Sequence, residues 1–291
     1  MAPKFEGIFT ALLTPFDKNN TINEKALSAL IEENLAKGVS GFYVNGSTAE
    51  NFLLTNEEKR YLLRLVRDIV KGRCTLIAHV GSISTAEACS LAQEAEKLGY
   101  DAVSSVAPFY YKFSFAEIKA YYYEIVSHVS IPMIVYNFPT FSGVNLSASQ
   151  IGEFLCDDRF LGVKHTSADY FAMRQFKSAY PEKKVFNGYD ETFLAGLSMG
   201  ADGAIGSTFN FMAEKFIKIH ELFRAGDIKA AMAVQEEADV IITALCKCGV
   251  MQGEKAILCA KGMDFGVARS PFAPLSPEAE KELLDTVLPL L

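Results

Sequence analysis

Residues 199–208 read MGADGAIGST, and this stretch is the clearest indication of the fold. Gly200, which can end a helix, is followed after one residue by Asp202 and then by the short apolar run GAIG, which is typical of a buried strand. The same order of residues occurs in KGVSGF at 37–42 and in LGYDAV at 98–103. The chain therefore repeats one local unit, in which a helix ends, a short turn follows and a strand begins.

Eight apolar or β-branched stretches, each followed by a helical pattern, predict eight strands. They cover residues 7–16, 41–46, 75–81, 102–108, 132–137, 160–166, 184–190 and 203–208. Continuous apolarity suits strands that are covered on both faces, and the stretches between them are long enough for crossover helices. The sequence therefore predicts an α/β protein with a closed (β/α)8 TIM barrel, ahead of an open doubly wound sheet, because no G-x-G-x-x-G follows any strand.

The ends of the helices and the last part of the chain complete the predicted organisation. TNEE at 55–58 and SFAE at 114–117 fit capping boxes. After about residue 225 the strand pattern stops, and three helical stretches follow, with the Pro-rich connector 268–277 before the last of them. We expect a barrel over residues 1–225 and a C-terminal three-helix extension over residues 226–291 that packs on it.

Composition excludes several classes of function. The formal net charge of −7 disfavours a nucleic-acid partner, which requires a clustered basic surface. No signal-peptide pattern and no run of 18 apolar residues occurs, so we expect a cytoplasmic protein without a membrane partner. The six cysteines are scattered, and two of the four histidines fall inside helical patterns without a partner at ligand spacing, so we expect no disulfide, no metal site and no cofactor.

Polar and aromatic residues cluster where the predicted strands end, which is where barrels of this kind place their chemistry. We expect these side chains to face one mouth: Ser47, Thr48, Glu50, Tyr110, Tyr111, Tyr136, Lys164, Thr166, Asp190, Glu191, Ser207 and Thr208.

Lys164 is the most informative of these residues. A lysine in a closed, partly dry mouth loses hydration, so its pKa falls and the neutral amine can attack a ketone to form a Schiff base. Tyr136 on the adjacent strand end can relay protons to and from such an intermediate. The alternatives are a lysine that extends its ammonium to solvent or pairs with Asp190 or Glu191, and a tyrosine that only packs.

Two loops offer groups for a ligand. NGSTAEN at 45–51 supplies hydroxyls and backbone N–H groups in a turn expected to open a helix, which suits a carboxylate. GYDE at 188–191 supplies two carboxylates that could hold the hydroxyls of an acyclic sugar. The alternative for residues 45–51 is ordinary loop and helix-cap chemistry. The alternative for residues 188–191 is a solvated helix start.

GSTAE, VYNFPTFSGVNL, GVKHTS and NGYDE, in this order and spacing, resemble the blocks of the N-acetylneuraminate lyases within the pyruvate-dependent class I aldolase family, which also includes the dihydrodipicolinate synthases. The resemblance runs through the whole chain. It implies the following roles: Lys164 as Schiff-base lysine, Tyr136 as proton relay, Ser47 and Thr48 at the substrate carboxylate, Thr166, Gly188, Asp190, Glu191 and Ser207 around the sugar chain, and Tyr110 at a subunit boundary of a homotetramer.

The activity that this resemblance implies is reversible cleavage of N-acetylneuraminate to pyruvate and N-acetylmannosamine. Phe141 stands where many dihydrodipicolinate synthases carry a carboxylate-binding arginine, which favours the lyase within the family. Another pyruvate-dependent aldolase, a dihydrodipicolinate synthase or a keto-sugar-acid aldolase, is the alternative enzyme. A sialic-acid-binding barrel without catalysis is the non-enzyme alternative, although such a protein is expected to lack Lys164 or Tyr136.

Overall fold

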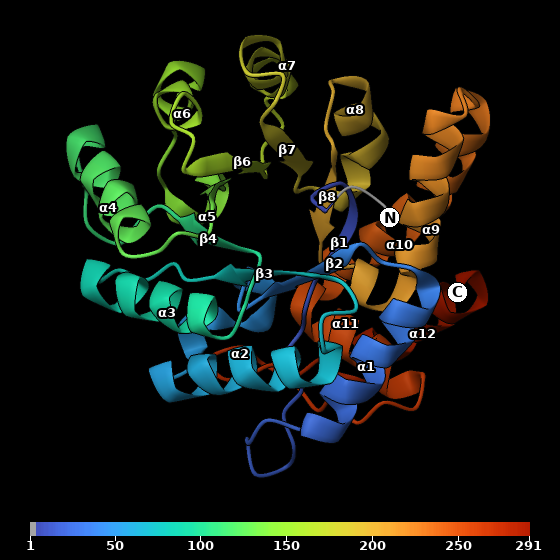
Figure 1. The fold of residues 1–291 in the computed structure, drawn as a ribbon. Helices are drawn as coiled ribbons and strands as arrows, with labels where there is room; N and C mark the ends of the chain where they lie inside the picture. Colours follow the sequence, from blue (N-terminus) through green and yellow to red (C-terminus); the bar gives the residue numbers. More distant parts are fainter. Residues whose placement is uncertain (1–3) are drawn as a thin grey trace.

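Eight parallel strands form a closed barrel in the computed structural model, which describes residues 4–291 (Figure 1). The strands are β1 (Gly7–Ala11), β2 (Gly41–Val44), β3 (Thr75–His79), β4 (Ala102–Val106), β5 (Met133–Asn137), β6 (Phe160–His165), β7 (Lys184–Asn187) and β8 (Gly203–Gly206). β8 pairs in parallel with β1, which closes the sheet. The predicted TIM barrel is confirmed.

Helices surround the barrel, as Figure 1 shows. The α-helices are α1 (Glu24–Lys37), α2 (Asn56–Val70), α3 (Thr85–Lys97), α4 (Phe115–Ser127), α5 (Pro139–Ser142), α6 (Ala148–Leu155), α7 (Tyr170–Ala179), α8 (Phe193–Ser198), α9 (Phe209–Arg224), α10 (Ile228–Cys248), α11 (Val250–Ala260) and α12 (Pro277–Val287). The 3₁₀ turns are η1 (Ser47–Ala49), η2 (Asn51–Leu53), η3 (Asp190–Thr192) and η4 (Leu288–Leu290). Within residues 4–291, no helix combines the length and apolarity needed to cross a membrane.

The C-terminal helices α10, α11 and α12 confirm the predicted helical extension. α10 packs along α9 and against α11 and α12, so the extension lies against the last helix of the barrel. The turn between α9 and α10 spans residues 225–227, close to the predicted boundary. The division of the chain into two domains at that turn stays a prediction.

The repeated sequence unit has a common physical basis. Gly200 adopts a φ of 99°, a left-handed conformation that ends α8 at little steric cost. The N–H of Asp202 donates to the Val185 carbonyl at 2.8 Å, and Oδ2 of Asp202 accepts from the Val185 N–H at 2.8 Å. The residue before each strand therefore ties the turn to the neighbouring strand. The same reciprocal pair joins Ser40 to Ile8 and Asp101 to Leu76.

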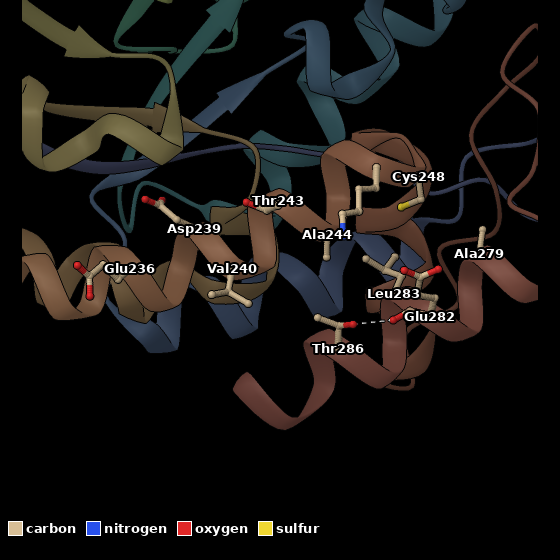
Figure 2. Close-up of a pocket in the computed structure, with 11 residues that line it drawn as sticks. Glu236, Asp239, Val240, Thr243, Ala244, Cys248, Ala279, Glu282, Leu283 and Thr286 are labelled. Atoms are coloured by element: carbon tan, nitrogen blue, oxygen red, sulfur yellow. Dashed lines mark hydrogen bonds between the residues drawn. The ribbon is translucent and has the colours of Figure 1, made fainter.

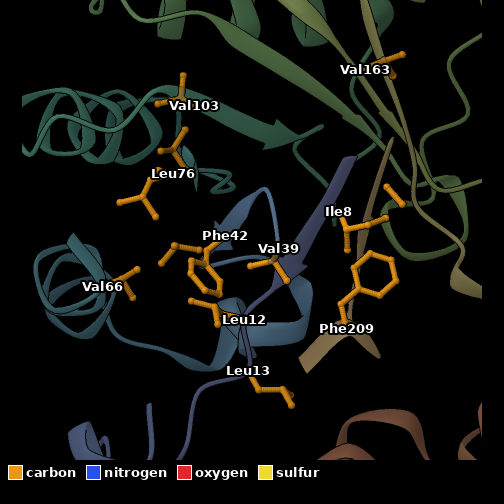
Figure 3. Packing of buried hydrophobic residues seen from close by; sticks show 14 of the residues in the cluster. Ile8, Leu12, Leu13, Val39, Phe42, Val66, Leu76, Val103, Val163 and Phe209 are labelled. Atoms are coloured by element: carbon orange, nitrogen blue, oxygen red, sulfur yellow. The ribbon is translucent and has the colours of Figure 1, made fainter. Parts of the chain in front are cut away.

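Alternating side chains build two apolar layers. Ile8 and Phe42 point outward and pack between the strands and the helices (Figure 3), whereas Phe9 and Tyr43 point into the barrel. Inside, the rings of Phe9 and Phe186 meet edge to face with their centroids 5.4 Å apart. The interior is thus filled by side chains, and the open space lies at the strand ends.

Both predicted capping boxes are present, at Thr55 with Glu58 and at Ser114 with Glu117. The first strand is shorter than predicted and ends at Ala11 rather than at residue 16. The chain leaves the sheet there, and the N–H of Phe16 instead donates to the carbonyl of Phe265, in the segment after α11, at 3.1 Å. Apolar character alone did not reveal that this segment contacts the C-terminal extension.

Candidate active site

Tyr136 on β5 and Lys164 on β6 are paired in register, and both side chains lie inside the barrel. Their predecessors, Val135 and Val163, face the outer layer, so alternation along the strands directs the two functional groups inward. Lys164 is only 5% exposed. Its Nζ lies 4.3 Å from the ring centroid of Tyr136 and 4.5 Å from that of Tyr43. The amine is therefore enclosed by aromatic rings.

Burial lowers the pKa of Lys164 to about 7, because the enclosed ammonium has lost its hydration. The negative charge of Asp190 opposes this shift. Within residues 4–291, the Asp190 carboxylate accepts its hydrogen bonds from Thr208 and not from the lysine. A substantial fraction of Lys164 is thus neutral near pH 7, as a nucleophilic amine requires.

Tyr136 keeps its proton at neutral pH. Burial raises the pKa of this phenol to about 12, and the nearby hydroxyls of Ser47 and Thr166 partly offset the increase. Oγ1 of Thr166 is buried and has no hydrogen-bond partner among residues 4–291. The phenol therefore stands among hydroxyl groups that can exchange protons with it.

A cavity of about 330 Å³ opens above these residues. Of the residues to which the family resemblance assigns a role, all except Tyr110 line it: Ser47, Thr48, Tyr136, Lys164, Thr166, Gly188, Asp190, Glu191 and Ser207. The volume is suited to a small organic ligand.

Asp190 and Glu191 differ in their surroundings. Asp190 is buried, and its Oδ2 accepts from the N–H and the hydroxyl of Thr208 at 2.9 and 2.7 Å. Burial nevertheless raises the pKa of Asp190 to about 6. Glu191 is exposed at the cavity, although partial burial raises its pKa as well. Asp190 thus fixes the loop after β8, while Glu191 is free to contact a ligand.

Gly188 has a steric role that the sequence did not reveal. A Cβ at this position would overlap Oγ1 of Thr166, so any other residue would displace that hydroxyl from the cavity. The glycine therefore lets the chain after β7 pass close to Thr166 while that hydroxyl stays at the cavity.

The prediction that all strand-end residues face one mouth is wrong for Glu50, Tyr110 and Tyr111. Glu50 is buried, forms a salt bridge with Lys255 of α11, and accepts from the N–H of Arg269 at 2.6 Å. Tyr110 and Tyr111 are 82% and 63% exposed and do not line the cavity. Glu50 instead contacts the C-terminal extension, and the two tyrosines lie on the surface.

The segment NGSTAEN also differs from its prediction. It does not open an α-helix, since Ser47 begins a 3₁₀ turn of three residues and α2 starts only at Asn56, behind the cap of Thr55. Glu50 adopts a left-handed conformation with a φ of 59°, which ends this turn. Any carboxylate held here would be bound by hydroxyls and local N–H groups rather than by the end of a long helix.

The C-terminal extension supplies a wall of the cavity that sequence reasoning missed. The lining residues from α10 and α11 are mainly apolar: Ile242, Leu245, Cys246, Val250 and Met251. Those of α10 recur at i, i+3 and i+4, which marks one face of a helix. That spacing indicates a covered face but not what covers it.

A second hollow, of about 460 Å³, lies between α10 and α12 (Figure 2). It is lined by Glu236, Asp239, Lys247 and Glu282 among others, and no strand-end residue reaches it. Within residues 4–291, no group of three or more His, Cys, Asp or Glu side chains is arranged to hold a metal ion. The cavity around Lys164 is therefore the candidate active site.

Fold and cavity together define a (β/α)8 barrel with a buried lysine on its sixth strand. The chain belongs to the dihydrodipicolinate synthetase family, whose sequence model matches residues 4–288. It is 42% identical over 289 residues to the N-acetylneuraminate lyase of Rhizobium meliloti (strain 1021), covering 99% of this chain and 96% of that protein.

Solved structures agree with this assignment. CdNal from Clostridium difficile in complex with mannosamine superposes with a TM-score of 0.96 at 39% identity, covering 99% and 100% of the two chains. The N-acetylneuraminate lyase of Fusobacterium nucleatum complexed with pyruvate gives 0.92 at 39% identity, covering 99% and 98%. A catalytic lysine mutant of the Ruminococcus gnavus sialic acid aldolase gives 0.94 at 31% identity, covering 99% and 97%.

Replacing Lys164 by Met is expected to stabilise the folded protein near neutral pH, because the methionine has no ammonium to desolvate. The pKa of Lys164 is lower in the folded protein than the ordinary value of 10.5, so between about 7 and 10.5 the unfolded chain binds more protons. The gain should be greatest at and below pH 7 and shrink as the pH rises towards 10.5. Denaturant unfolding over this range measures the gain.

Lys229→Met serves as the control, because Lys229 is exposed on α10 and its replacement should change stability by no more than about 0.5 kcal/mol. A Lys164→Met protein that is less stable than the parent at pH 6 would show that the lysine stabilises the barrel.

Proposed function

We propose that the protein is an N-acetylneuraminate lyase, a class I aldolase that reversibly cleaves N-acetylneuraminate to pyruvate and N-acetylmannosamine. One observation carries the proposal: a buried lysine with a pKa of about 7 lies beside a protonated tyrosine in a cavity that also presents hydroxyls and carboxylates. The names of the similar proteins support the same activity. The small-molecule partners of this site are then sialic acid and pyruvate.

The reaction begins at Lys164. Its neutral amine attacks the C2 ketone of open-chain N-acetylneuraminate, and the resulting carbinolamine loses water to form an iminium ion. The C3–C4 bond then breaks, and its electron pair moves to C3 and into the iminium, leaving an enamine. The C4 hydroxyl loses its proton and becomes the aldehyde of N-acetylmannosamine. Because the iminium accepts the electrons, the proposed chemistry requires no metal or cofactor.

Tyr136 is the proposed proton relay. Since its pKa of about 12 keeps it protonated, it can accept a proton from the C4 hydroxyl only by passing its own proton to a neighbour. The hydroxyls of Ser47 and Thr166 lie beside it and can carry that proton. Protonation of the enamine at C3 and hydrolysis of the iminium then release pyruvate and restore the amine.

The two ends of the cavity suit the two ends of the substrate. Ser47 and Thr48 are proposed to hold the carboxylate, since their hydroxyls reach the cavity near Tyr136. Thr166, Gly188, Asp190, Glu191 and Ser207 are proposed to surround the sugar chain. A polyhydroxylated chain can donate to the two carboxylates, whereas a phosphate would be repelled by them.

Phe141 disfavours a second carboxylate. Its ring stacks on that of Phe138 with centroids 4.3 Å apart, and both rings line the cavity. A carboxylate placed against these rings would be partly desolvated without a cationic partner. This arrangement supports the lyase over condensation of pyruvate with aspartate semialdehyde.

Tyr110 supports a proposed homotetramer. It adopts a φ of 81°, which is strained for a bulky residue, and its ring meets the exposed ring of Tyr111 at 5.0 Å. An exposed aromatic pair of this kind is typical of a protein interface. An apolar hollow of about 460 Å³ beside the site, lined by Phe52 and Phe109, could receive an aromatic side chain from a neighbouring subunit. The cytoplasmic location stays a prediction from the sequence.

Borohydride should trap pyruvate covalently on Lys164 and on no other lysine, because this amine alone combines burial in the cavity with a strongly lowered pKa. The trapping rate should rise with pH and level off above the pKa of about 7, since only the neutral amine attacks. Peptide mass mapping identifies the site. Lys164→Ala should abolish trapping while Lys229→Ala retains it, and trapping elsewhere or none at all would refute the Schiff-base mechanism.

Tyr136→Phe should reduce kcat by roughly 10²-fold or more, because it removes the relaying hydroxyl while keeping the ring that packs on Tyr43. Denaturant unfolding should show little change in stability. A parallel loss of stability and activity would instead support a packing role for this tyrosine.

The ratio of kcat/KM for N-acetylneuraminate cleavage to that for condensation of pyruvate with aspartate semialdehyde should strongly favour cleavage. Both reactions are measured on the same preparation. Higher efficiency with the semialdehyde would assign the chain to the synthase activity of its family, and binding of N-acetylneuraminate without turnover would assign it to the non-enzyme alternative.

Analytical ultracentrifugation coupled to an activity assay should find the active species at four times the chain mass of 32.0 kDa. Tyr110→Ala should lower activity, because each site would lose a residue from its neighbour. A fully active monomer would overturn this expectation.

A further inference from the structure

α11 carries a buried acid that the reaction proposed above does not use. Glu254 is 0% exposed and follows the cavity-lining residues Val250 and Met251 by four and three positions. Residues at these spacings lie on the same face of a helix. Glu254 therefore belongs to the face of α11 that turns toward the wall of the cavity.

The carboxyl group of Glu254 is unpaired. Neither of its oxygens has a hydrogen-bond partner among residues 4–291. The adjacent Lys255 cannot neutralise it, since that ammonium forms its salt bridge with Glu50. An isolated buried carboxylate is costly, so the group favours its neutral form. Burial raises the pKa of Glu254 to about 8, and the charge of Asp190 adds to the increase.

Ser207 links Glu254 to the cavity, because it lies near the Glu254 carboxyl and also lines the cavity. Its hydroxyl is close enough to the Glu254 carboxyl to lower the acid's pKa, and the same residue lines the cavity beside Asp190. The Ser207 backbone is held, because its carbonyl accepts from Nδ2 of Asn210 at 2.6 Å. Rotation of the side chain and its hydroxyl is the freedom that remains at this position.

A serine hydroxyl has one proton and two lone pairs, so its neighbour decides what it offers to a ligand. An ionised Glu254 would accept that proton, and the cavity would then present lone pairs at Ser207 beside the acceptors Asp190 and Glu191. A neutral Glu254 can instead donate to Oγ of Ser207. The serine proton is then free to point into the cavity.

We propose that Glu254 is a positioning residue: when the Ser207 side chain turns towards it, the neutral carboxyl donates a hydrogen bond to Oγ of Ser207, and Ser207 in turn donates into the cavity, to an oxygen of the sugar chain. The proposal rests on the lyase function for the identity of that ligand. It gives the sugar end of the site a donor beside its carboxylate acceptors. A polyhydroxylated chain needs both, because each hydroxyl donates one hydrogen bond and accepts others.

Three substitutions separate this role from simple packing. Glu254→Gln keeps the side-chain volume and an N–H donor, whereas Glu254→Met keeps the volume and removes the donor. Glu254→Asp keeps the acid but withdraws it from Ser207 by one methylene. kcat and KM for N-acetylneuraminate are measured for each variant in the parent and in a Ser207→Ala background.

Glu254→Met and Glu254→Asp should lower kcat/KM by roughly 3- to 10-fold, the usual effect of one hydrogen bond, while Glu254→Gln stays within about 2-fold of the parent. In the Ser207→Ala background Glu254→Met should cause no further loss, because the two residues act as one unit. Two outcomes would overturn the proposal: a Glu254→Gln variant as impaired as Glu254→Met, or losses from Glu254→Met and Ser207→Ala that simply multiply in the double variant.

Trapping of pyruvate on Lys164 distinguishes this inference from the proposed function. It should be unchanged in every Glu254 variant, since the pyruvate portion is proposed to bind at Ser47 and Thr48. Failure of trapping in the parent protein would refute the lyase mechanism itself. Normal trapping combined with equal kcat/KM in all Glu254 variants would refute only the role of Glu254. If the Glu254→Met variant does not fold, the comparison of Glu254→Gln with Glu254→Asp still decides.

Discussion

The parallel register that sets Tyr136 opposite Lys164 inside the barrel is the constraint on which the rest of the site depends. A closed barrel leaves an inward-pointing side chain no route to bulk water except through the mouth. The amine of Lys164 therefore rests on aromatic rings instead of water, and its pKa falls. Fold and reactivity are thus coupled through dehydration of the amine.

The same dehydration acts on the acids around the mouth. Burial raises the pKa values of Asp190 and Glu254, and the two acids reduce the free-energy cost of burying a carboxylate in different ways. Asp190 accepts two hydrogen bonds from Thr208, which ties it to the loop after β8. Glu254 has no such donor and therefore favours its neutral form. Two buried acids close to the mouth thus differ in protonation, because within residues 4–291 only one of them is hydrogen-bonded as a carboxylate.

The C-terminal helices complete the site as well as the fold. Apolar residues of α10 and α11 form one wall of the cavity, and the buried salt bridge between Glu50 and Lys255 joins α11 to the loop that carries Ser47. Breaking one partner of a buried pair leaves an uncompensated charge, so this contact holds the two segments in a defined relation. The position of the Ser47 hydroxyl therefore depends on a helix about 200 residues away in the sequence.

Local sequence determined the strands, the helix ends and the set of polar residues at the strand ends, because periodicity, capping and glycine turns act over a few residues. It could not determine which of those residues point away from the cavity. Glu50 and Tyr110 were expected in the site, but the structure places Glu50 against α11 and Tyr110 on the surface. Nor could local sequence identify the contribution of α10 and α11, or the unpaired acid at Glu254. Those features depend on contacts between distant segments, and only the closed barrel with its packed extension decides which side chains lose water together.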